Sequence, residues 1–317
     1  MSNLMPVKLK PTFKDYLWGG TRLKEEFGKE CDLERVAESW ELSAHKDGQS
    51  IVEGGAYANM TLSEYIDTIG RDALGENSLK YDYFPLLIKL IDAKGDLSVQ
   101  VHPSDSFALA NEGEYGKTEM WYVLAADEGA CLYYGFQRDV SKDEYKSAIA
   151  EGRLTDLLCH VPVKPGDVFF IPAGTVHAIG AGILICEIQQ NSNTTYRVYD
   201  YNRRDKDGNL RPLHIEKALQ VSDLKKSPPL PVIGDEAEVT LADCEYFKVR
   251  RLRVSDRSEI CVDRSSFLSL TVTRGEGVLR HAEGEVEIKK GDTLFIPAQE
   301  ACFEVVGNLE MIESKVN

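Results

Sequence analysis

Alternating apolar and polar residues recur along the chain and predict a protein built mainly from β-strands. VKLKPTF near the N-terminus alternates in this way, and Tyr83 to Ile91 is instead a continuous apolar run, typical of a strand buried on both faces. Further strands are predicted at 99–101, 120–124, 131–134, 167–171, 182–189 and 195–199.

Three stretches have helical periodicity instead. Residues 59–75 place apolar side chains on one face, and Thr61 and Glu64 have the spacing of a capping box. Residues 141–158 form a second helical stretch, and 213–220 are expected to form a short helix.

The segment 225–235 (KKSPPLPVIGD) is rich in proline and charge and is the best candidate for a linker. The sequence therefore predicts a first domain at 1–225, with helical segments near 59–75 and 141–158, and a C-terminal β domain at 226–317. The strands predicted after the linker are 267–273, 277–280, 285–288 and 293–296.

An internal repeat supports two similar β-barrels in tandem. GDVFFIPA at 166–173 matches GDTLFIPA at 291–298, an offset of 125 residues (291 − 166). At that offset His177 corresponds to Cys302, so only the first copy keeps a histidine after the shared octet.

The net charge of the chain restricts the kinds of molecule that it can bind. There are 52 acidic against 37 basic residues, a formal charge of −15, which disfavours nucleic acid and means that an anionic substrate needs a local basic pocket. The N-terminus lacks the apolar core of a signal peptide, and no apolar run approaches the ~20 residues that span a bilayer. We therefore expect a soluble, cytoplasmic protein without a membrane partner.

The seven cysteines include no CxxC pair, and their number is odd. This pattern argues against a disulfide framework and a zinc ribbon, and it favours free thiols in a reducing compartment, many of them buried.

Four side chains form a candidate metal site. Gln100 and His102 lie two apart in a predicted strand and so project from one face. Glu119 precedes the strand at 120–124, and His177 closes the segment IPAGTVH. Two imidazoles, a carboxylate and an amide oxygen suit a borderline divalent metal. A lone histidine in a β protein is more often structural, as we expect for His45, His160, His214 and His281.

The order Q-x-H-P, K-x-E and P-x-G-x-x-H is typical of cupin barrels, and three longer segments resemble class I mannose-6-phosphate isomerases in their short form. They are FPLLIKLIDAKGDLSVQVHP, GKTEMWYVL and GDVFFIPAGTVHAIGAGILICEIQQNSNTTYRVYDYNR. The resemblance implies tandem cupin (jelly-roll) β-barrels with a small helical insertion. It also implies a zinc ion on Gln100, His102, Glu119 and His177.

The same resemblance implies further site residues. Ser98 and Lys117 match positions that line the sugar-phosphate pocket, and Arg203 is a candidate phosphate contact. Arg197 and Glu187 match positions of the family's active site, with Lys117 as a third catalytic candidate.

The chain also departs from the longer members of the family. Some of them have a histidine directly before the K-x-E lysine, where this chain has Gly116, so a proton-transfer role for that histidine cannot be transferred. Only 57 residues lie between Glu119 and His177 (177 − 119 − 1), which leaves room for a small helical insertion alone.

The implied reaction interconverts mannose 6-phosphate and fructose 6-phosphate by moving a proton between C1 and C2 through a cis-enediol. It needs a Lewis acid, a base and cations for the phosphate. The base remains open between Lys117, Glu187, Asp200 and a water at the metal, and Arg197 is either a stabiliser of the enediolate or an ion-pair partner of Asp200.

Two other functions compete with the isomerase. Another metal cupin enzyme, such as a dioxygenase, would usually present three histidines and a carboxylate, whereas Gln100 here replaces one of them. A sugar-binding bicupin without turnover would keep the metal ligands and lose the cationic groups. The expected partner is a small sugar phosphate, and the expected state is a monomer or homodimer.

Overall fold

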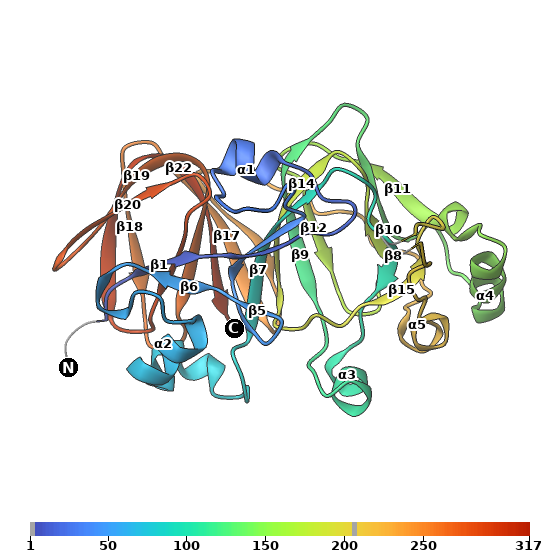
Figure 1. The fold of residues 1–317 in the computed structure, drawn as a ribbon, viewed down its shortest axis with the longest axis horizontal. Helices are drawn as coiled ribbons and strands as arrows, with labels where there is room; N and C mark the ends of the chain where they lie inside the picture. The colour runs from blue at the N-terminus through green and yellow to red at the C-terminus, as the bar shows by residue number, and fades with distance from the viewer. Residues whose placement is uncertain (1–3, 205–207) are drawn as a thin grey trace.

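The computed structural model describes residues 4–204 and 208–317 (Figure 1). Three large sheets lie side by side, and helices cover the outer face of the sheet at one end. The five-stranded sheet has the order β11 (Leu158–Pro162), β10 (Cys131–Phe136), β13 (His177–Ile179), β8 (Val99–Val101) and β15 (Tyr196–Tyr199). The six-stranded sheet has the order β12 (Val168–Ile171), β9 (Glu119–Ala126), β14 (Ile183–Gln190), β7 (Leu86–Ala93), β3 (Glu38–Leu42) and β2 (Thr12–Lys14).

The third sheet has nine strands and forms the C-terminal barrel; its strands from the C-terminal part of the chain are drawn in orange and red in Figure 1, and β1 and β6 in blue. Its main path is β16 (Glu238–Asp243), β17 (Phe247–Val254), β22 (Ala301–Val316), β19 (Leu268–His281), β21 (Thr293–Ile296), β1 (Val7–Lys10) and β6 (Ile51–Glu53). The remaining strands are β18 (Arg257–Val262) on β22, β20 (Gly284–Lys289) on β19, and the separate pair β4 (Ala44–His45) and β5 (Gly48–Gln49).

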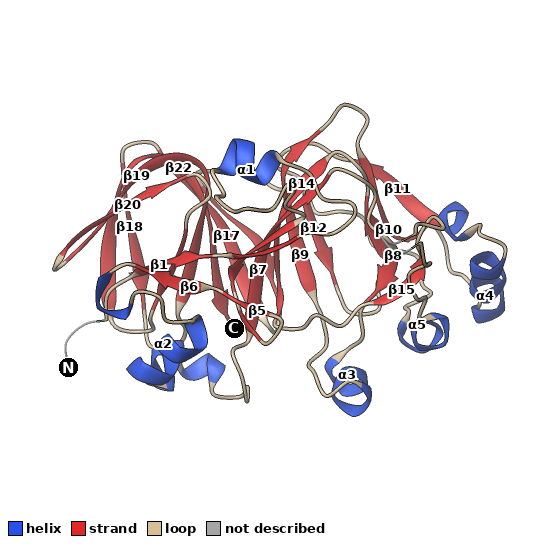
Figure 2. Cartoon of the chain, in the orientation of Figure 1, coloured by secondary structure: helices blue, strands red, loops and turns tan. Residues whose placement is uncertain are grey.

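The fold is mainly β, as predicted, and the helices are short (Figure 2). They are α1 (Arg22–Phe27), α2 (Leu62–Ile69), α3 (Asp105–Asn111), α4 (Lys142–Ala150) and α5 (Ile215–Val221), with 3₁₀ turns at Gly55–Tyr57, Arg71–Leu74, Glu76–Ser78 and Leu154–Leu157. Within residues 4–204 and 208–317, no helix has the length and apolar character needed to cross a bilayer.

The six-stranded sheet is buried on both faces, which explains the continuous apolar run predicted for β7. All eight residues of β7 are buried. Ile88 and Leu90 pack into a cluster shared with the nine-stranded sheet, whereas Ile91 points into the space shared with the five-stranded sheet. Lys89 lies on the same side as Ile91, since alternate residues share a face. That inner space holds the candidate site.

The predicted helices are confirmed in position but are shorter than expected. The capping box at Thr61 is complete: its hydroxyl accepts from the Glu64 backbone, and the Glu64 carboxylate accepts from the Thr61 backbone. The stretch 141–158 contains α4, then a 3₁₀ turn. Helix α3 was not predicted, since its seven residues are too few to show a periodic stripe.

The internal repeat is confirmed as the same local structure in both barrels. β12 spans Val168–Ile171 and β21 spans Thr293–Ile296, again 125 residues apart (293 − 168). The preceding glycines, Gly166 and Gly291, have φ values of 92° and 94°, a region open mainly to glycine.

Two predictions for the C-terminal region are wrong. The strands expected at 267–273 and 277–280 are parts of one continuous strand, β19, because β19 pairs with the long strand β22 from Ser269 to Arg280. Cys261 and Cys302 are not free thiols but form a disulfide, since they lie directly opposite each other on β18 and β22. Five cysteines are free, and of these only Cys186 is buried.

Candidate functional site

His102, Glu119 and His177 converge inside the first barrel, between the five- and six-stranded sheets. Glu119 begins β9, His177 begins β13, and His102 directly follows β8. Nε2 of His177 lies 3.3 Å from Oε1 of Glu119, and Nε2 of His102 lies 3.6 Å from Oε2. All three side chains are buried.

Backbone carbonyls fix the orientation of both imidazoles. Nδ1 of His102 is 2.9 Å from the carbonyl oxygen of Thr194, and Nδ1 of His177 is 2.8 Å from that of Thr175. A carbonyl oxygen can only accept, so each Nδ1 carries the proton and each Nε2 presents a lone pair to the centre of the group. This is the tautomer that a metal ligand requires.

The carboxylate of Glu119 also fits a metal. Neither of its oxygens has a hydrogen bond of acceptable geometry, although Nζ of Lys117 lies 2.7 Å from Oε2. A buried carboxylate without aligned donors is costly unless a cation completes it. The ligand atoms of the three side chains lie within 4.8 Å of one another, so one ion can contact all of them.

The side chain of Gln100 lies beside His177. Its Nε2 is 3.5 Å from Nε2 of His177, where the imidazole offers only a lone pair. An amide turned by 180° would present its oxygen at the same place, and the two amide atoms are assigned from their surroundings. The side chain can therefore supply a fourth, oxygen ligand.

A second cluster of buried charged side chains lies next to this site. Oε1 of Glu187 lies 3.2 Å from Nζ of Lys89 and 3.9 Å from Nζ of Lys117, and Trp121 donates to Oε2 at 2.9 Å. Lys89 also lies 3.8 Å from Glu38. Sequence reasoning missed Lys89 and Glu38, and the signal that could have found Lys89 is a single lysine within the apolar run YFPLLIKLI.

Neighbouring charges separate the pKa values of the two carboxylates. Burial raises the pKa of Glu119 to about 8, with the nearby charge of Glu187 adding to the shift. Burial acts the same way on Glu187, but the ammonium groups of Lys117 and Lys89 outweigh it and lower that pKa to about 2.

Burial also keeps both imidazoles neutral. It lowers the pKa of His177 to about 4, and it holds the pKa of His102 well below its usual range, with the charge of Lys117 acting in the same direction. A neutral imidazole is the form that binds metals.

A cavity of about 280 Å³ opens beside these groups. Its walls carry charge of both signs together with aromatic rings, a lining suited to a polar, anionic ligand. The lining residues are Tyr16, Trp18, Glu38, Lys89, Ile91, Leu97, Ser98, Gln100, Lys117, Ile179, Glu187, Asn193, Thr195, Arg197 and Arg211. Trp18 lines the cavity, whereas Trp40 is fully buried and donates to Glu38.

Two arginines line this cavity, and one predicted arginine does not. Arg197 on β15 donates to the Ser98 hydroxyl at 3.3 Å and does not pair with Asp200. Asp200 is paired instead with Arg203 and Arg211. Only Arg211 of that pair reaches the cavity, so the role given to Arg203 stays a prediction.

These two β-barrels, with a His–Glu–His group inside the first, define a protein of the cupin class. Residues 6–134 match the family model described as phosphomannose isomerase type I, catalytic domain, and residues 237–316 match mannose-6-phosphate isomerase, cupin domain. The chain is an isomerase and belongs to the type I phosphomannose isomerase family.

Similar proteins cover the whole chain. It is 42% identical to mannose-6-phosphate isomerase ManA of Bacillus subtilis (strain 168) and 40% identical to the mannose-6-phosphate isomerase of Streptococcus mutans, with 98% of each chain covered in both cases. The crystal structure of the mannose 6-phosphate isomerase from Bacillus subtilis superposes with a TM-score of 0.91 at 38% identity, over 98% of this chain and 99% of that one.

Proposed function

We propose that the protein is a zinc-dependent mannose-6-phosphate isomerase, which interconverts mannose 6-phosphate and fructose 6-phosphate by proton transfer between C1 and C2. Family membership supports the reaction. The observation that carries the proposal is the convergence of His102, Glu119 and His177 beside a cavity lined by charge.

The donor set supports zinc. His102, His177, Glu119 and Gln100 offer two nitrogens and two oxygens, a set that suits a borderline divalent ion. The ion, when bound, polarises a sugar oxygen and thereby acidifies the neighbouring C–H bonds.

Glu187 is our candidate for the residue that moves the proton through the cis-enediol. It lines the cavity, it is ionised over the working pH range, and its Oε1 has no hydrogen bond of acceptable geometry. Lys117 lies beside it as the candidate proton donor. Asp200 is a weaker candidate, because two arginines already pair with its carboxylate.

The cationic end of the cavity suits the phosphate. Arg197, Arg211 and Ser98 all line the cavity, and Arg197 donates to the Ser98 hydroxyl at 3.3 Å. A guanidinium group can bind two phosphate oxygens at once. We assign the phosphate to Ser98 and Arg211, and we assign to Arg197 the stabilisation of negative charge on the enediolate.

Three expectations accompany the proposal. The catalytic unit is 1–225 and the C-terminal β domain is 226–317, to whose sheet the early strands β1 and β6 contribute. The protein acts in the cytoplasm. It is a monomer or homodimer.

A coupled assay with mannose 6-phosphate tests the proposal directly. We expect activity that a chelator removes and that zinc restores at one ion per chain. His177→Asn should lose both zinc and activity, whereas His160→Asn, which alters an exposed histidine outside the site, should keep both.

Two results would contradict the proposal. Zinc bound at one per chain without turnover would favour a sugar-binding bicupin. Activity restored by iron and not by zinc, on another substrate, would favour a different metal-dependent cupin enzyme.

A further inference from the structure

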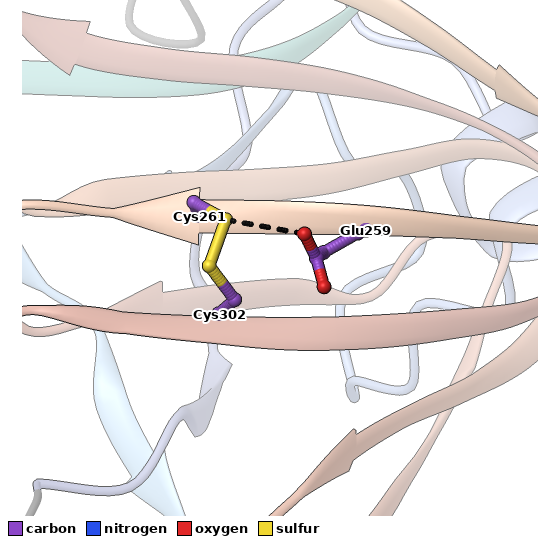
Figure 3. Close-up of a disulfide and its surroundings, with 3 residues drawn as sticks. All are labelled: Glu259, Cys261 and Cys302. Carbon is purple, nitrogen blue, oxygen red and sulfur yellow. Dashed lines mark hydrogen bonds between the residues drawn. A yellow bond between two sulfur atoms is a disulfide. The ribbon is translucent and has the colours of Figure 1, made fainter.

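The outer face of the C-terminal barrel carries two cysteines and a glutamate in one group (Figure 3). Glu259 and Cys261 lie two apart on β18 and so share a face, and Cys302 on β22 is the direct pairing partner of Cys261. All three side chains are exposed, and their potential ligand atoms lie within 4.8 Å of one another. Among the described strands, β18 hydrogen-bonds to β22 alone, so the group sits at a sheet edge.

Comparison of the two copies of the repeat shows that this group lies outside its barrel, whereas the catalytic site lies inside the first barrel. Cys302 corresponds to His177 by sequence offset, but His177 is buried inside its barrel and Cys302 is exposed outside. Its neighbour Phe303 takes the inward position instead. Cys261 and Cys302 therefore place two sulfur atoms on the surface of the second barrel.

The cysteine pair is oxidised in the structure, and its exposure makes it open to reduction. In the structure the two sulfurs are bonded, with Cα atoms 4.0 Å apart. An external dithiol can reach an exposed disulfide: it attacks one sulfur, breaks the bond, is itself oxidised to a disulfide, and leaves two thiols on the protein. The strand pairing holds these two thiols side by side after reduction, because backbone hydrogen bonds fix the register.

Glu259 is the carboxylate that remains free for a ligand in this group. Its pairing partner across the strands is Glu304, which is engaged by Arg257 and Arg280. Among the residues that the structure describes, Glu259 has no ion-pair partner, and its Oε2 lies 3.7 Å from Sγ of Cys261, the contact dashed in Figure 3.

We propose that Glu259, Cys261 and Cys302 form a second metal site, which binds a thiophilic divalent cation such as Zn²⁺ or Cd²⁺ only when the disulfide is open. Two thiolates and one carboxylate supply three ligands, and water completes a four-coordinate shell. Binding releases the two thiol protons. The site goes beyond the proposed isomerase activity, because it uses none of the residues that line the catalytic cavity.

Cadmium titration of the reduced full-length protein tests the proposal. Thiolate–cadmium bonds give an ultraviolet charge-transfer band, and the catalytic site contains no sulfur ligand that could produce it. After reduction by a phosphine, we expect the absorbance of this band to reach its maximum at one cadmium ion per chain. We expect no band from the oxidised protein. The double variant C261S/C302S should lose the band, and Glu259→Gln should weaken cadmium binding by roughly ten-fold or more.

The control is Cys131→Ser, which removes a free cysteine on the other barrel and should leave the band unchanged. Unaltered isomerase activity in every variant would show that each is folded. The proposal fails if reduced protein gives no band, if the double variant keeps it, or if the oxidised protein gives the same band.

Discussion

Single residues in this site differ in charge because their neighbours differ, although all of them are buried. Glu119 and Glu187 are both carboxylates inside one barrel, yet the pKa of Glu119 is raised to about 8 and that of Glu187 is lowered to about 2. Lys117 lies near both carboxylates, 2.7 Å from Glu119 and 3.9 Å from Glu187. Glu187 also has Lys89 at 3.2 Å and a hydrogen bond from Trp121, whereas the negative charge of Glu187 acts on Glu119. Separated pKa values in one site are typical of groups with different tasks.

Glu187→Gln separates proton transfer from metal binding. The amide keeps the shape of the side chain but cannot accept a proton, so kcat should fall by roughly 100- to 10,000-fold. Zinc content should stay at one ion per chain, since Glu187 is not a proposed ligand. Steady-state kinetics with metal analysis checks both. If kcat is retained and Lys117→Ala abolishes it instead, the base is Lys117.

A comparison of the variants Arg211→Ala and Arg203→Ala tests which arginine binds the phosphate. Both arginines pair with Asp200, but only Arg211 lines the cavity. Loss of a charged hydrogen bond to phosphate should lower kcat/KM by about ten- to hundred-fold in Arg211→Ala. Arg203→Ala should change it by much less. A larger loss of kcat/KM in Arg203→Ala than in Arg211→Ala would assign phosphate binding to Arg203.

The candidate ligands could be predicted from sequence because each lies in a short local pattern. Gln100 and His102 share a strand face, and His177 ends a repeat that has a second copy for comparison. Lys89 and Glu38 could not be found in this way. They meet only because β3 and β7 pair side by side, and such pairing between distant segments leaves no local signal.

At the scale of elements, the loop before β9 explains a departure from longer family members. Gly116 packs against the backbone at the start of α3, so a Cβ there would lie 2.5 Å from the backbone nitrogen of Asp105 and 2.7 Å from the carbonyl oxygen of Pro103. No side chain fits without a backbone shift, so this loop cannot accept the histidine expected at this place in some longer members of the family. The same loop carries Lys117, whose backbone donates to the Pro103 carbonyl.

Gly116→Ala should therefore perturb both stability and the site. Forcing the loop apart should cost about 1–3 kcal/mol in the free energy of unfolding, and it should lower kcat by displacing Lys117. Urea unfolding and kinetics measure the two effects. Gly95→Ala is the matched control, since a Cβ there meets its nearest atoms at 3.7 Å. Equal stability of the two variants would contradict the packing argument.

At the scale of the whole molecule, the two barrels share a core. One hydrophobic cluster runs from Leu9 near the N-terminus to Val316 near the C-terminus. Within it, Phe295 of the second barrel packs against Phe84, Phe267 and Tyr65. The linker composition at 225–235 predicts a boundary along the sequence, but it cannot show that β1 crosses that boundary to pair with β21. We therefore expect the barrels to unfold together.

Phe295→Ala tests this coupling. Removing a fully buried ring should cost about 3–5 kcal/mol, and Phe295→Leu should cost less. All three tryptophans lie in the first 225 residues, so their fluorescence reports on the first barrel. We expect the fluorescence midpoint in urea to fall in Phe295→Ala. An unchanged midpoint would show that the barrels unfold independently.

The segment that contains α4 connects β10 to β11. It begins after Phe136 and ends before Leu158, and these two residues are pairing partners in the five-stranded sheet. The ends of the segment are thus held together by the sheet itself, whatever lies between them. Because the entropy of closing a loop rises only slowly with its length, this position can accept extra chain at little cost to the ladder that holds His177. A lineage could exchange a small helical cap here for a large one, and so remodel the exterior of the enzyme, while the geometry of its reaction centre is inherited unchanged.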